Sequence, residues 1–192
     1  MKQLHIQASS IIQPDSDSGW DRNIPPRLKR RDPRIWHMAY AATKLVIDKG
    51  TDTPRSIITS TAFGALDETG NFLDSIYKTG FGSPRHFISS VHNSMGGKLA
   101  IEFTIKGPNL TFCDGPNSFA SAIAACSLIE HEFFPVLVVA VDESIELLSS
   151  LRPYLAPECA GFLSSDWREA ACAFIIDRNH SGKTPRIASA GP

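Results

Sequence analysis

Cysteine and histidine are the residue types in this sequence with the clearest capacity for nucleophilic and acid–base chemistry. The chain has 4 cysteines and 6 histidines. The cysteines are Cys113, Cys126, Cys159 and Cys172. Because no two of them form a CxxC pair, the spacing argues against a zinc site, and we expect neither a metal nor a cofactor. A nucleophilic thiol needs a neighbouring base, and His92 is the candidate base for Cys113.

A cluster of basic residues is the clearest candidate for binding a charged partner. It closes a polar, turn-rich segment, residues 13–33, which we expect to be irregular. The cluster consists of Arg27, Lys29, Arg30, Arg31 and Arg34. Such a run is either a solvated face or a docking patch for an acidic partner, and both interpretations stay open.

Composition limits the class of protein. With 192 residues and 42% hydrophobic content, the chain is long enough for a single domain, residues 1–192, with its own core. The 19 basic and 20 acidic residues give a net charge of −1, which offers nucleic acid no attractive field. No apolar run reaches the ~20 residues of a membrane span, and residues 1–10 lack the apolar stretch of a secretory signal. We therefore expect a cytoplasmic protein that binds neither nucleic acid nor membrane.

Alternating helices and strands must position these residues. Apolar side chains at helical spacing, β-branched runs and glycine stops define the expected elements. The expected helices are 35–46, 72–77 and 118–132, and the expected strands are 57–61, 110–112, 135–141 and 171–176. The uncharged run after Pro135 needs apolar cover on both of its faces, as in a parallel sheet. The pattern predicts an α/β fold with a mainly parallel sheet covered by helices on both faces.

Three segments carry a resemblance to a known family. Residues 83–97, SPRHFISSVHNSMGG, resemble the SP-x-x-F-x-x-SVHN-x-x-x-G segment of the thiolase-like β-ketoacyl synthase superfamily. Residues 107–111 resemble the Gly-Pro strand that leads into the nucleophile turn of that family, and residues 137–143 its apolar strand with an acidic end. The resemblance spans roughly residues 35–177 and is greatest to short chain-length-factor-like proteins of aryl polyene and type II polyketide pathways. It implies a thiolase-like half-fold, the N-terminal domain of a β-ketoacyl synthase.

The nucleophile position departs from the family pattern. Ketosynthases place a cysteine at the turn before a helix, whose N-terminus lowers the pKa of the thiol. Aligned without gaps from Gly107, this position falls on Pro116, which has neither a thiol nor the backbone N–H that the family uses as an oxyanion donor. Cys113 is the alternative nucleophile, three residues earlier on the strand, whereas Cys126 falls on the apolar face of the following helix. We therefore assign no catalytic residue and keep Cys113 as the alternative.

The resemblance also covers only the first half of a ketosynthase. In the family, the second half supplies the paired histidines that activate the malonyl-carrier substrate. None of the 6 histidines of this chain matches that context, and His92 belongs to the interface region of the family.

Together, these features imply a non-catalytic, chain-length-factor-like subunit. Such a subunit pairs with an active full-length ketosynthase as a heterodimer and shapes the tunnel for the growing acyl chain. The candidate interface or tunnel residues are Phe87, His92, Asn93, Met95, Gly96, Leu110, Thr111, Phe112 and Phe119. Arg27, Arg30 and Arg31 would dock the acyl carrier protein. Two alternatives stay open: a stand-alone acyltransferase or thioesterase that uses Cys113, and a carrier-binding scaffold that does not control chain length.

Overall fold

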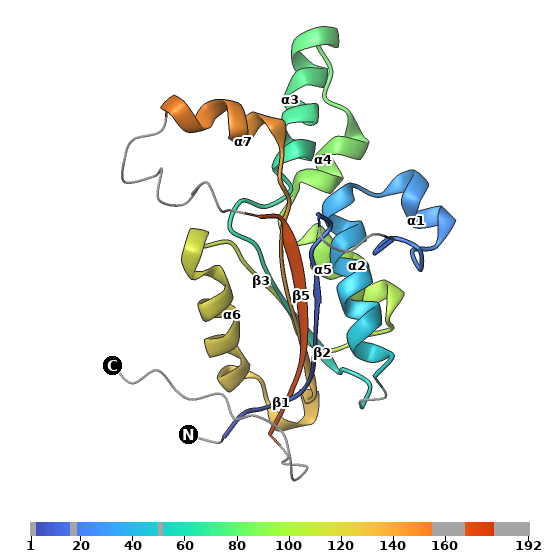
Figure 1. The fold of residues 1–192 in the computed structure, drawn as a ribbon, viewed down its shortest axis with the longest axis vertical. Helices are drawn as coiled ribbons and strands as arrows, with labels where there is room; N and C mark the ends of the chain where they lie inside the picture. Colours follow the sequence, from blue (N-terminus) through green and yellow to red (C-terminus); the bar gives the residue numbers. More distant parts are fainter. Residues whose placement is uncertain (1–2, 16–18, 50–51, 155–167, 179–192) are drawn as a thin grey trace.

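Figure 1 shows the fold in a computed structural model, which describes residues 3–15, 19–49, 52–154 and 168–178. Its centre is a five-stranded sheet. The strands are β1 (His5–Ile12), β2 (Ser56–Ser60), β3 (Asn109–Phe112), β4 (Val136–Asp142) and β5 (Ala170–Asp177). They lie in the order β1-β5-β4-β2-β3, so β1 and β3 form the two edges of the described sheet.

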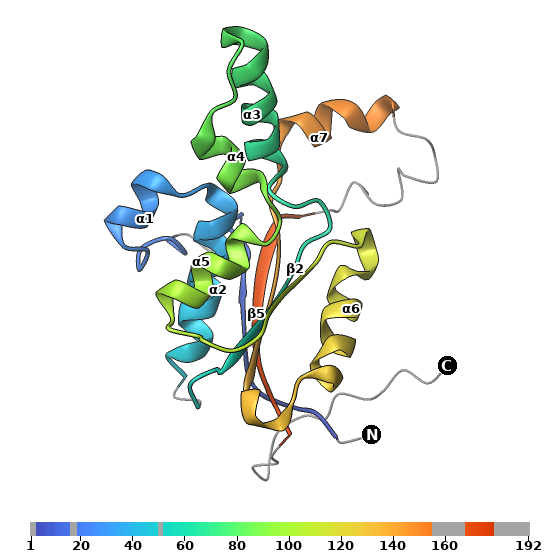
Figure 2. The ribbon, with the colours of Figure 1, turned by 180° about the vertical axis from the view of Figure 1, so that it is seen from behind.

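Helices cover both faces of this sheet, as the sequence predicts. Figures 1 and 2 view the sheet nearly edge-on, with α2 (Arg34–Ile47) and α5 (Ser94–Glu102) on one face and α6 (Ser118–Ala125) on the other. Alternate residues of β4 enter two separate cores, because successive side chains of a strand point to opposite faces. Leu137, Val139 and Val141 pack in the core under α2, and Val136 and Val138 pack in the core under α6. The α/β class is thereby confirmed.

A helical hairpin stands at the end of the molecule where β2 terminates. It consists of α3 (Leu66–Thr79) and α4 (Pro84–Ser90), and its helices contact each other far more than the sheet. Gly80 ends α3 in the left-handed conformation with φ 77°, and the Ser83 side chain accepts from the His86 N–H at 3.5 Å to cap α4. Both features follow from sequence signals for helix ends. The short helix α7 (Glu146–Leu151) lies at the same end.

Several local details differ from the sequence-based expectations. The segment expected to be irregular contains a short helix, α1 (Pro26–Arg31), which begins at a proline in the position that favours helix starts. The helix expected over 118–132 stops at Ala125 and continues as 3-10 turns at Cys126–Leu128 and His131–Phe133. Further 3-10 turns lie at Gly115–Asn117 and Arg152–Tyr154.

The strand β1 and the directions of two pairings were also not predicted. The strand β2 pairs in parallel with β3 and β4, whereas β5 runs antiparallel to both β4 and β1. The sheet is therefore mixed, with its parallel half at the β3 edge, and the expectation of a mainly parallel sheet holds only for that half. Half of the β1 residues are polar, and its strand conformation comes from pairing with β5, which is a tertiary effect. Among the described helices, none is long and apolar enough to cross a membrane.

Candidate functional site

The edge strand β3 is the first part of the candidate site. Its inner side pairs with β2, and no described strand lies on its outer side. The Phe112 carbonyl accepts from the Thr61 N–H and therefore points towards β2. Since the N–H and C=O of a strand residue share a side and adjacent residues alternate, Thr111 directs its backbone groups away from β2. These outward groups make β3 a template for pairing with a further strand.

Side-chain contacts with β2 and a close approach of α5 fix the position of β3 in the domain. The Thr111 hydroxyl hydrogen-bonds to that of Thr59 on β2 at 2.8 Å. A Cβ atom at Gly96 would lie 2.7 Å from Asn109 Oδ1 and 3.1 Å from Thr59 Oγ1, so only glycine lets α5 approach the strands this closely. Met95 is 3% exposed and belongs to the core. Of the candidate interface residues, Met95 and Gly96 therefore support β3 from inside and do not offer contact surface.

The turn between β3 and α6 is where the ketosynthase pattern expects its cysteine. Pro116 lies in this turn, within the 3-10 segment Gly115–Asn117. Ser118 closes the turn, because its Oγ accepts from the Asp114 N–H at 2.7 Å and donates to the Gly115 carbonyl at 2.7 Å. Position 116 of this turn thus offers neither a thiol nor a backbone N–H to stabilise an oxyanion, and the thiol of the β3–α6 connection is Cys113, at its first residue.

Cys113, the alternative nucleophile, lies just after β3 with an exposed side chain. Partial burial raises the pKa of its thiol, and the negative charges of Asp142 and Asp114 raise it further. Its Sγ lies 3.8 Å from the Ala62 carbonyl, and no hydrogen bond joins it to His92 among the described contacts. A catalytic thiol needs the opposite environment, with a neighbouring cation or base that favours the thiolate.

The remaining cysteines offer no reactive thiol in the described structure. Cys126 is buried in the core beside α6, and burial raises its pKa to about 12. Cys172 lies on β5, where burial also raises the pKa. Cys159 lies outside the described residues. Among those residues, no group of histidine, cysteine and carboxylate side chains is arranged to hold a metal ion.

Asp142 organises the loop beside the nucleophile turn, a role that sequence analysis did not assign. Its carboxylate accepts from the Thr61 hydroxyl at 2.7 Å and from the N–H groups of Ala62 at 2.8 Å and Phe63 at 3.2 Å. Burial raises the pKa of Asp142, while these hydrogen bonds act in the opposite direction. The sequence signal for this residue was the acidic end of an otherwise apolar strand.

The same loop packs against the segment between α4 and α5. Gly64 has φ 71°, and a Cβ atom there would lie 2.5 Å from His92 Nδ1. The imidazole therefore lies directly against the glycine backbone. His92 and Asn93 are both exposed, so this segment offers surface next to the parallel half of the sheet.

Aromatic residues of the candidate set lie on different elements. Phe87, on α4, is 54% exposed and packs on Phe72 with ring centroids 5.4 Å apart. Phe119, on α6, is 40% exposed and lies 5.5 Å from the Phe174 ring on β5. Phe112 is partly buried against the core under α6. The structure does not bring Phe87 and Phe119 into one cluster within a single chain.

The hairpin α3–α4 carries an additional exposed apolar surface that sequence analysis missed. Its exposed large apolar residues are Leu73, Ile76, Tyr77, Phe81, Phe87, Ile88 and Val91 at the end of α4. Exposed apolar surface of this extent is typical of interaction sites. The available signal was the spacing of Leu73, Ile76 and Tyr77, from which the sequence analysis inferred a helix but no exposed surface.

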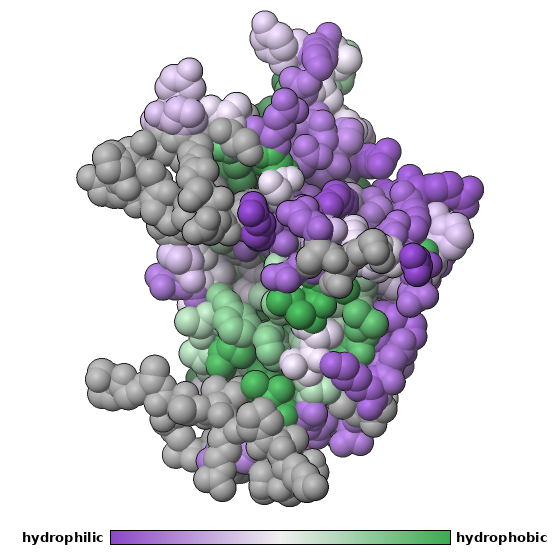
Figure 3. Space-filling model, viewed as in Figure 1, coloured by the Kyte–Doolittle hydropathy of each residue, from purple (hydrophilic) through white to green (hydrophobic). Residues whose placement is uncertain are grey.

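A separate hollow of about 340 Å³ lies at the opposite edge of the sheet. Its lining includes Ile11, Trp20, Tyr40, Lys44 and Leu45. Figure 3 shows an apolar area on this face, where β1 and α2 meet. None of the predicted site residues lies there.

Ion pairs engage some arginines of the basic cluster and leave others exposed to solvent. Arg27 makes a bidentate pair with Glu102 at 2.7 and 2.5 Å, and this pairing lowers the pKa of Glu102. Arg34 makes a bidentate pair with Glu169 at 2.5 Å for each bond. Arg30 and Arg31 are exposed on α1 and have no ion-pair partner among the described residues. They are therefore the members of the cluster that remain available to an acidic partner.

The mixed sheet, its parallel edge strand and the strand–turn–helix with Pro116 define a thiolase-like domain of the condensing-enzyme class. Residues 5–157 match the model of the β-ketoacyl synthase N-terminal domain, and the chain belongs to this family. No curated protein matches the chain.

Solved structures of condensing enzymes share the fold. A chain of "Ketosynthase (ApeO) in complex with its chain length factor (ApeC) from Xenorhabdus doucetiae" has a TM-score of 0.71 and 18% identity, covering 92% of this chain and 79% of that chain. A chain of "The ishigamide ketosynthase/chain length factor" has a TM-score of 0.74 and 16% identity, with coverages of 95% and 64%. A type II polyketide ketosynthase structure with its acyl-carrier protein, AntDE:AntF, has a TM-score of 0.72 and 16% identity, with coverages of 92% and 62%. The chain thus spans less than two thirds of the second and third of these chains.

Proposed function

We propose that this chain is a non-catalytic, chain-length-factor-like subunit that pairs with a full-length ketosynthase and helps to shape its acyl tunnel. The observation that carries the proposal is the strand β3, which is an open edge of the sheet formed by the described residues and leads into a turn that holds Pro116. An open edge favours strand pairing with a partner, a proline at the nucleophile position cannot attack an acyl thioester, and the raised pKa of the neighbouring Cys113 disfavours its thiolate.

The exposed residues around β3 support an interface with another protein. Leu110 is 38% exposed, and His92 and Asn93 are exposed on the neighbouring segment. The exposed apolar surface of α3–α4 directly precedes this segment in the sequence. Burying these groups against a partner removes apolar surface from water, which is a large favourable term in association. Structural relatives that are titled ketosynthase–chain length factor complexes support a ketosynthase as that partner.

Co-expression with a full-length ketosynthase tests this function. We expect the two chains to co-purify as a 1:1 heterodimer, and we expect the pair to make longer acyl products than the ketosynthase alone. The measurements are size-exclusion chromatography with light scattering and mass spectrometry of the products. A chain that stays monomeric with every ketosynthase encoded beside it would contradict the proposal.

The chain on its own should not catalyse condensation, transacylation or thioester hydrolysis. Cys113 has a raised pKa and acidic neighbours, so at neutral pH it is predominantly a thiol. We expect no turnover of acyl- and malonyl-carrier substrates by the isolated chain, and we expect a heterodimer that carries Cys113→Ser to keep the activity of the unmodified heterodimer. Turnover by the isolated chain that disappears in Cys113→Ser would support the acyltransferase or thioesterase alternative.

We also propose that Arg30 and Arg31 dock the acyl carrier protein. Replacing both with glutamate should weaken carrier binding roughly tenfold or more, because it replaces attraction by repulsion at exposed positions. Added salt should weaken binding to the unmodified protein in the same way. Titration by fluorescence anisotropy measures both effects. The matched control is Arg27→Gln: since Arg27 is already paired with Glu102, this change should weaken carrier binding much less.

A further inference from the structure

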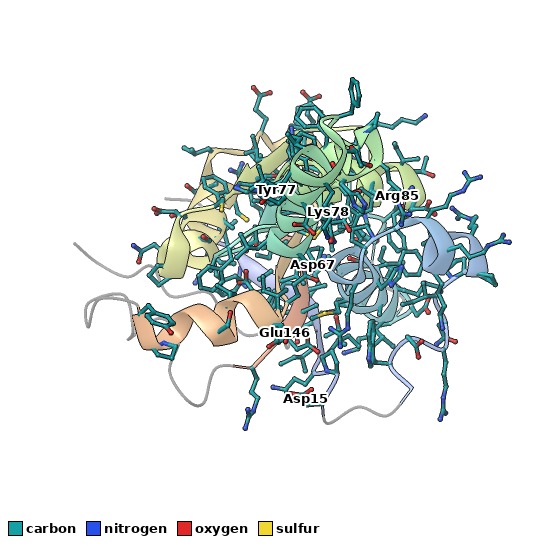
Figure 4. All side chains as sticks on the ribbon, turned by 90° about the horizontal axis from the view of Figure 1, so that it is seen from above. Asp15, Asp67, Tyr77, Lys78, Arg85 and Glu146 are labelled. Carbon is teal, nitrogen blue, oxygen red and sulfur yellow. The ribbon has the colours of Figure 1, made fainter. Side chains whose placement is uncertain are left out.

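A buried carboxylate group lies where the hairpin α3–α4 meets the sheet. Glu143 directly follows β4, is 6% exposed, and its Oε1 has no hydrogen-bond partner. Asp67 and Glu68, in the first turn of α3, and Glu169, just before β5, contribute negative charge around it. In the view from above, Asp67 lies between Lys78 of the same helix and Glu146 of α7 (Figure 4).

The basic side chains near Glu143 pair with two other carboxylates of the cluster. Arg34, at the start of α2, donates from both of its terminal nitrogens to the carboxylate of Glu169. The same carboxylate also accepts from the Ser144 N–H at 3.2 Å. His86, on α4, lies 2.9 Å from Glu68 Oε2. Glu143 therefore faces three carboxylates and one committed arginine, and it is the member of the cluster with an unsatisfied buried oxygen.

The hairpin has little apolar anchoring to the rest of the domain. Glu68 is the single buried residue of α3, and Ser89 is the single buried residue of α4. Segments with few buried apolar contacts open at a small free-energy cost. Leu66, the first residue of α3, packs against Ile145 and Leu148, so α3 is held at the end of β4 by this small apolar contact and by the charges of the cluster.

We propose that Glu143 is a proton-operated latch for the hairpin α3–α4. The protonated side chain is neutral and allows Asp67 and Glu68 to pack beside it. The ionised side chain repels both of them and loosens the first turn of α3. This regulation is independent of the proposed partner, since it concerns the seating of the hairpin in the isolated chain.

The electrostatics define the pH range of the latch. Burial is the main cause that raises the pKa of Glu143 to about 7; Asp67, Glu169 and Glu68 act in the same direction, and Arg34 opposes them. An opened hairpin exposes Glu143 to water, where its pKa returns to about 4.3. The closed state therefore binds more protons, so closure is tightest at low pH and weakens as the pH rises towards about 7.

Hydrogen exchange followed by mass spectrometry tests the latch on the full chain between pH 5 and pH 8. After correction for the intrinsic pH dependence of exchange, protection of residues 66–90 should fall by up to about tenfold per pH unit and level off above pH 7. Protection of β4 should stay constant and serves as the internal reference. In Glu143→Gln, the hairpin should be protected at every pH, and in Glu146→Gln, on exposed α7, the pH dependence should remain.

Two results would overturn the proposal. One is pH-independent protection of residues 66–90 in the unmodified chain, and the other is an unchanged pH dependence in Glu143→Gln. Parallel loss of protection in β4 would also overturn it, because opening would then be global. Should Glu143→Gln fail to fold, Asp67→Asn provides the test: it keeps Glu143 but should reduce the pH dependence, and an unchanged dependence would contradict the latch.

Discussion

Substituting proline for Thr111 should abolish pairing with a ketosynthase while leaving the domain folded. The backbone N–H of Thr111 points away from β2, so its loss removes no hydrogen bond within the sheet, and edge strands tolerate proline at such positions. Across an interface, a missing N–H leaves a partner carbonyl unsatisfied at a cost of about 1–3 kcal/mol. That cost corresponds to roughly 5–150-fold weaker binding, and the steric effect of the ring adds to it.

Two controls separate the interface effect from a loss of stability. Thr111→Val keeps the backbone N–H and loses only the hydroxyl contact with Thr59, so it should bind the partner nearly as well as the unmodified chain. Thermal unfolding of each isolated variant checks that the domain is intact. Full heterodimer formation by Thr111→Pro, measured by light scattering, would rule out β3 as the pairing strand. A charged residue at Phe112 is a poorer probe, because that side chain packs on the core under α6.

Replacing Asp142 with alanine should destabilise the domain strongly. The carboxylate accepts hydrogen bonds from the Thr61 hydroxyl and from the N–H groups of Ala62 and Phe63. Alanine leaves these partly buried donors without an acceptor, and we expect the free energy of unfolding to fall by about 2–4 kcal/mol. Denaturant titration followed by circular dichroism measures the change.

Two further variants test whether the loss of stability comes from the hydrogen bonds that Asp142 accepts. Asp142→Asn keeps one acceptor oxygen and should lose less stability than Asp142→Ala. Asp48→Ala removes an exposed carboxylate that pairs with Lys44 one helical turn away, and it should change the free energy of unfolding by about 0.5 kcal/mol or less. Equal effects of Asp142→Ala and Asp48→Ala would show that the loop 61–64 does not depend on Asp142.

Most of the core was predictable because its sequence signals are local and unambiguous. The uncharged run that became β4 requires cover on both faces, and the structure provides α2 and α6. The end of α3 at Gly80 and the cap of α4 at Ser83 follow from residue types that suit those backbone positions. β1 was missed because an edge strand in which half of the residues are polar depends on its neighbour, and α1 was missed because its six residues lie in a proline-rich segment.

The candidate site was predictable in part. The order of residues along the chain places Pro116 between a strand and a helix, and the structure has it in that turn. The sequence could not reveal that Met95 is buried, that Gly96 supports β3, or that Arg27 is neutralised by Glu102, since these depend on contacts between distant segments. For the same reason it gave no indication that Asp142 holds the loop 61–64.

The sequence by itself determined the α/β alternation, the two-faced core and the absence of a thiol at position 116, because periodicity and residue identity act over a few neighbouring positions. Only the tertiary structure decided that β3 lies at an open edge and that β5 runs antiparallel, since strand order and direction result from long-range pairing. It also decided the environment of Glu143, where two carboxylates of α3 and one that directly precedes β5 add negative charge around one buried side chain. Such convergence depends on how the elements pack, and no local pattern of residues encodes it.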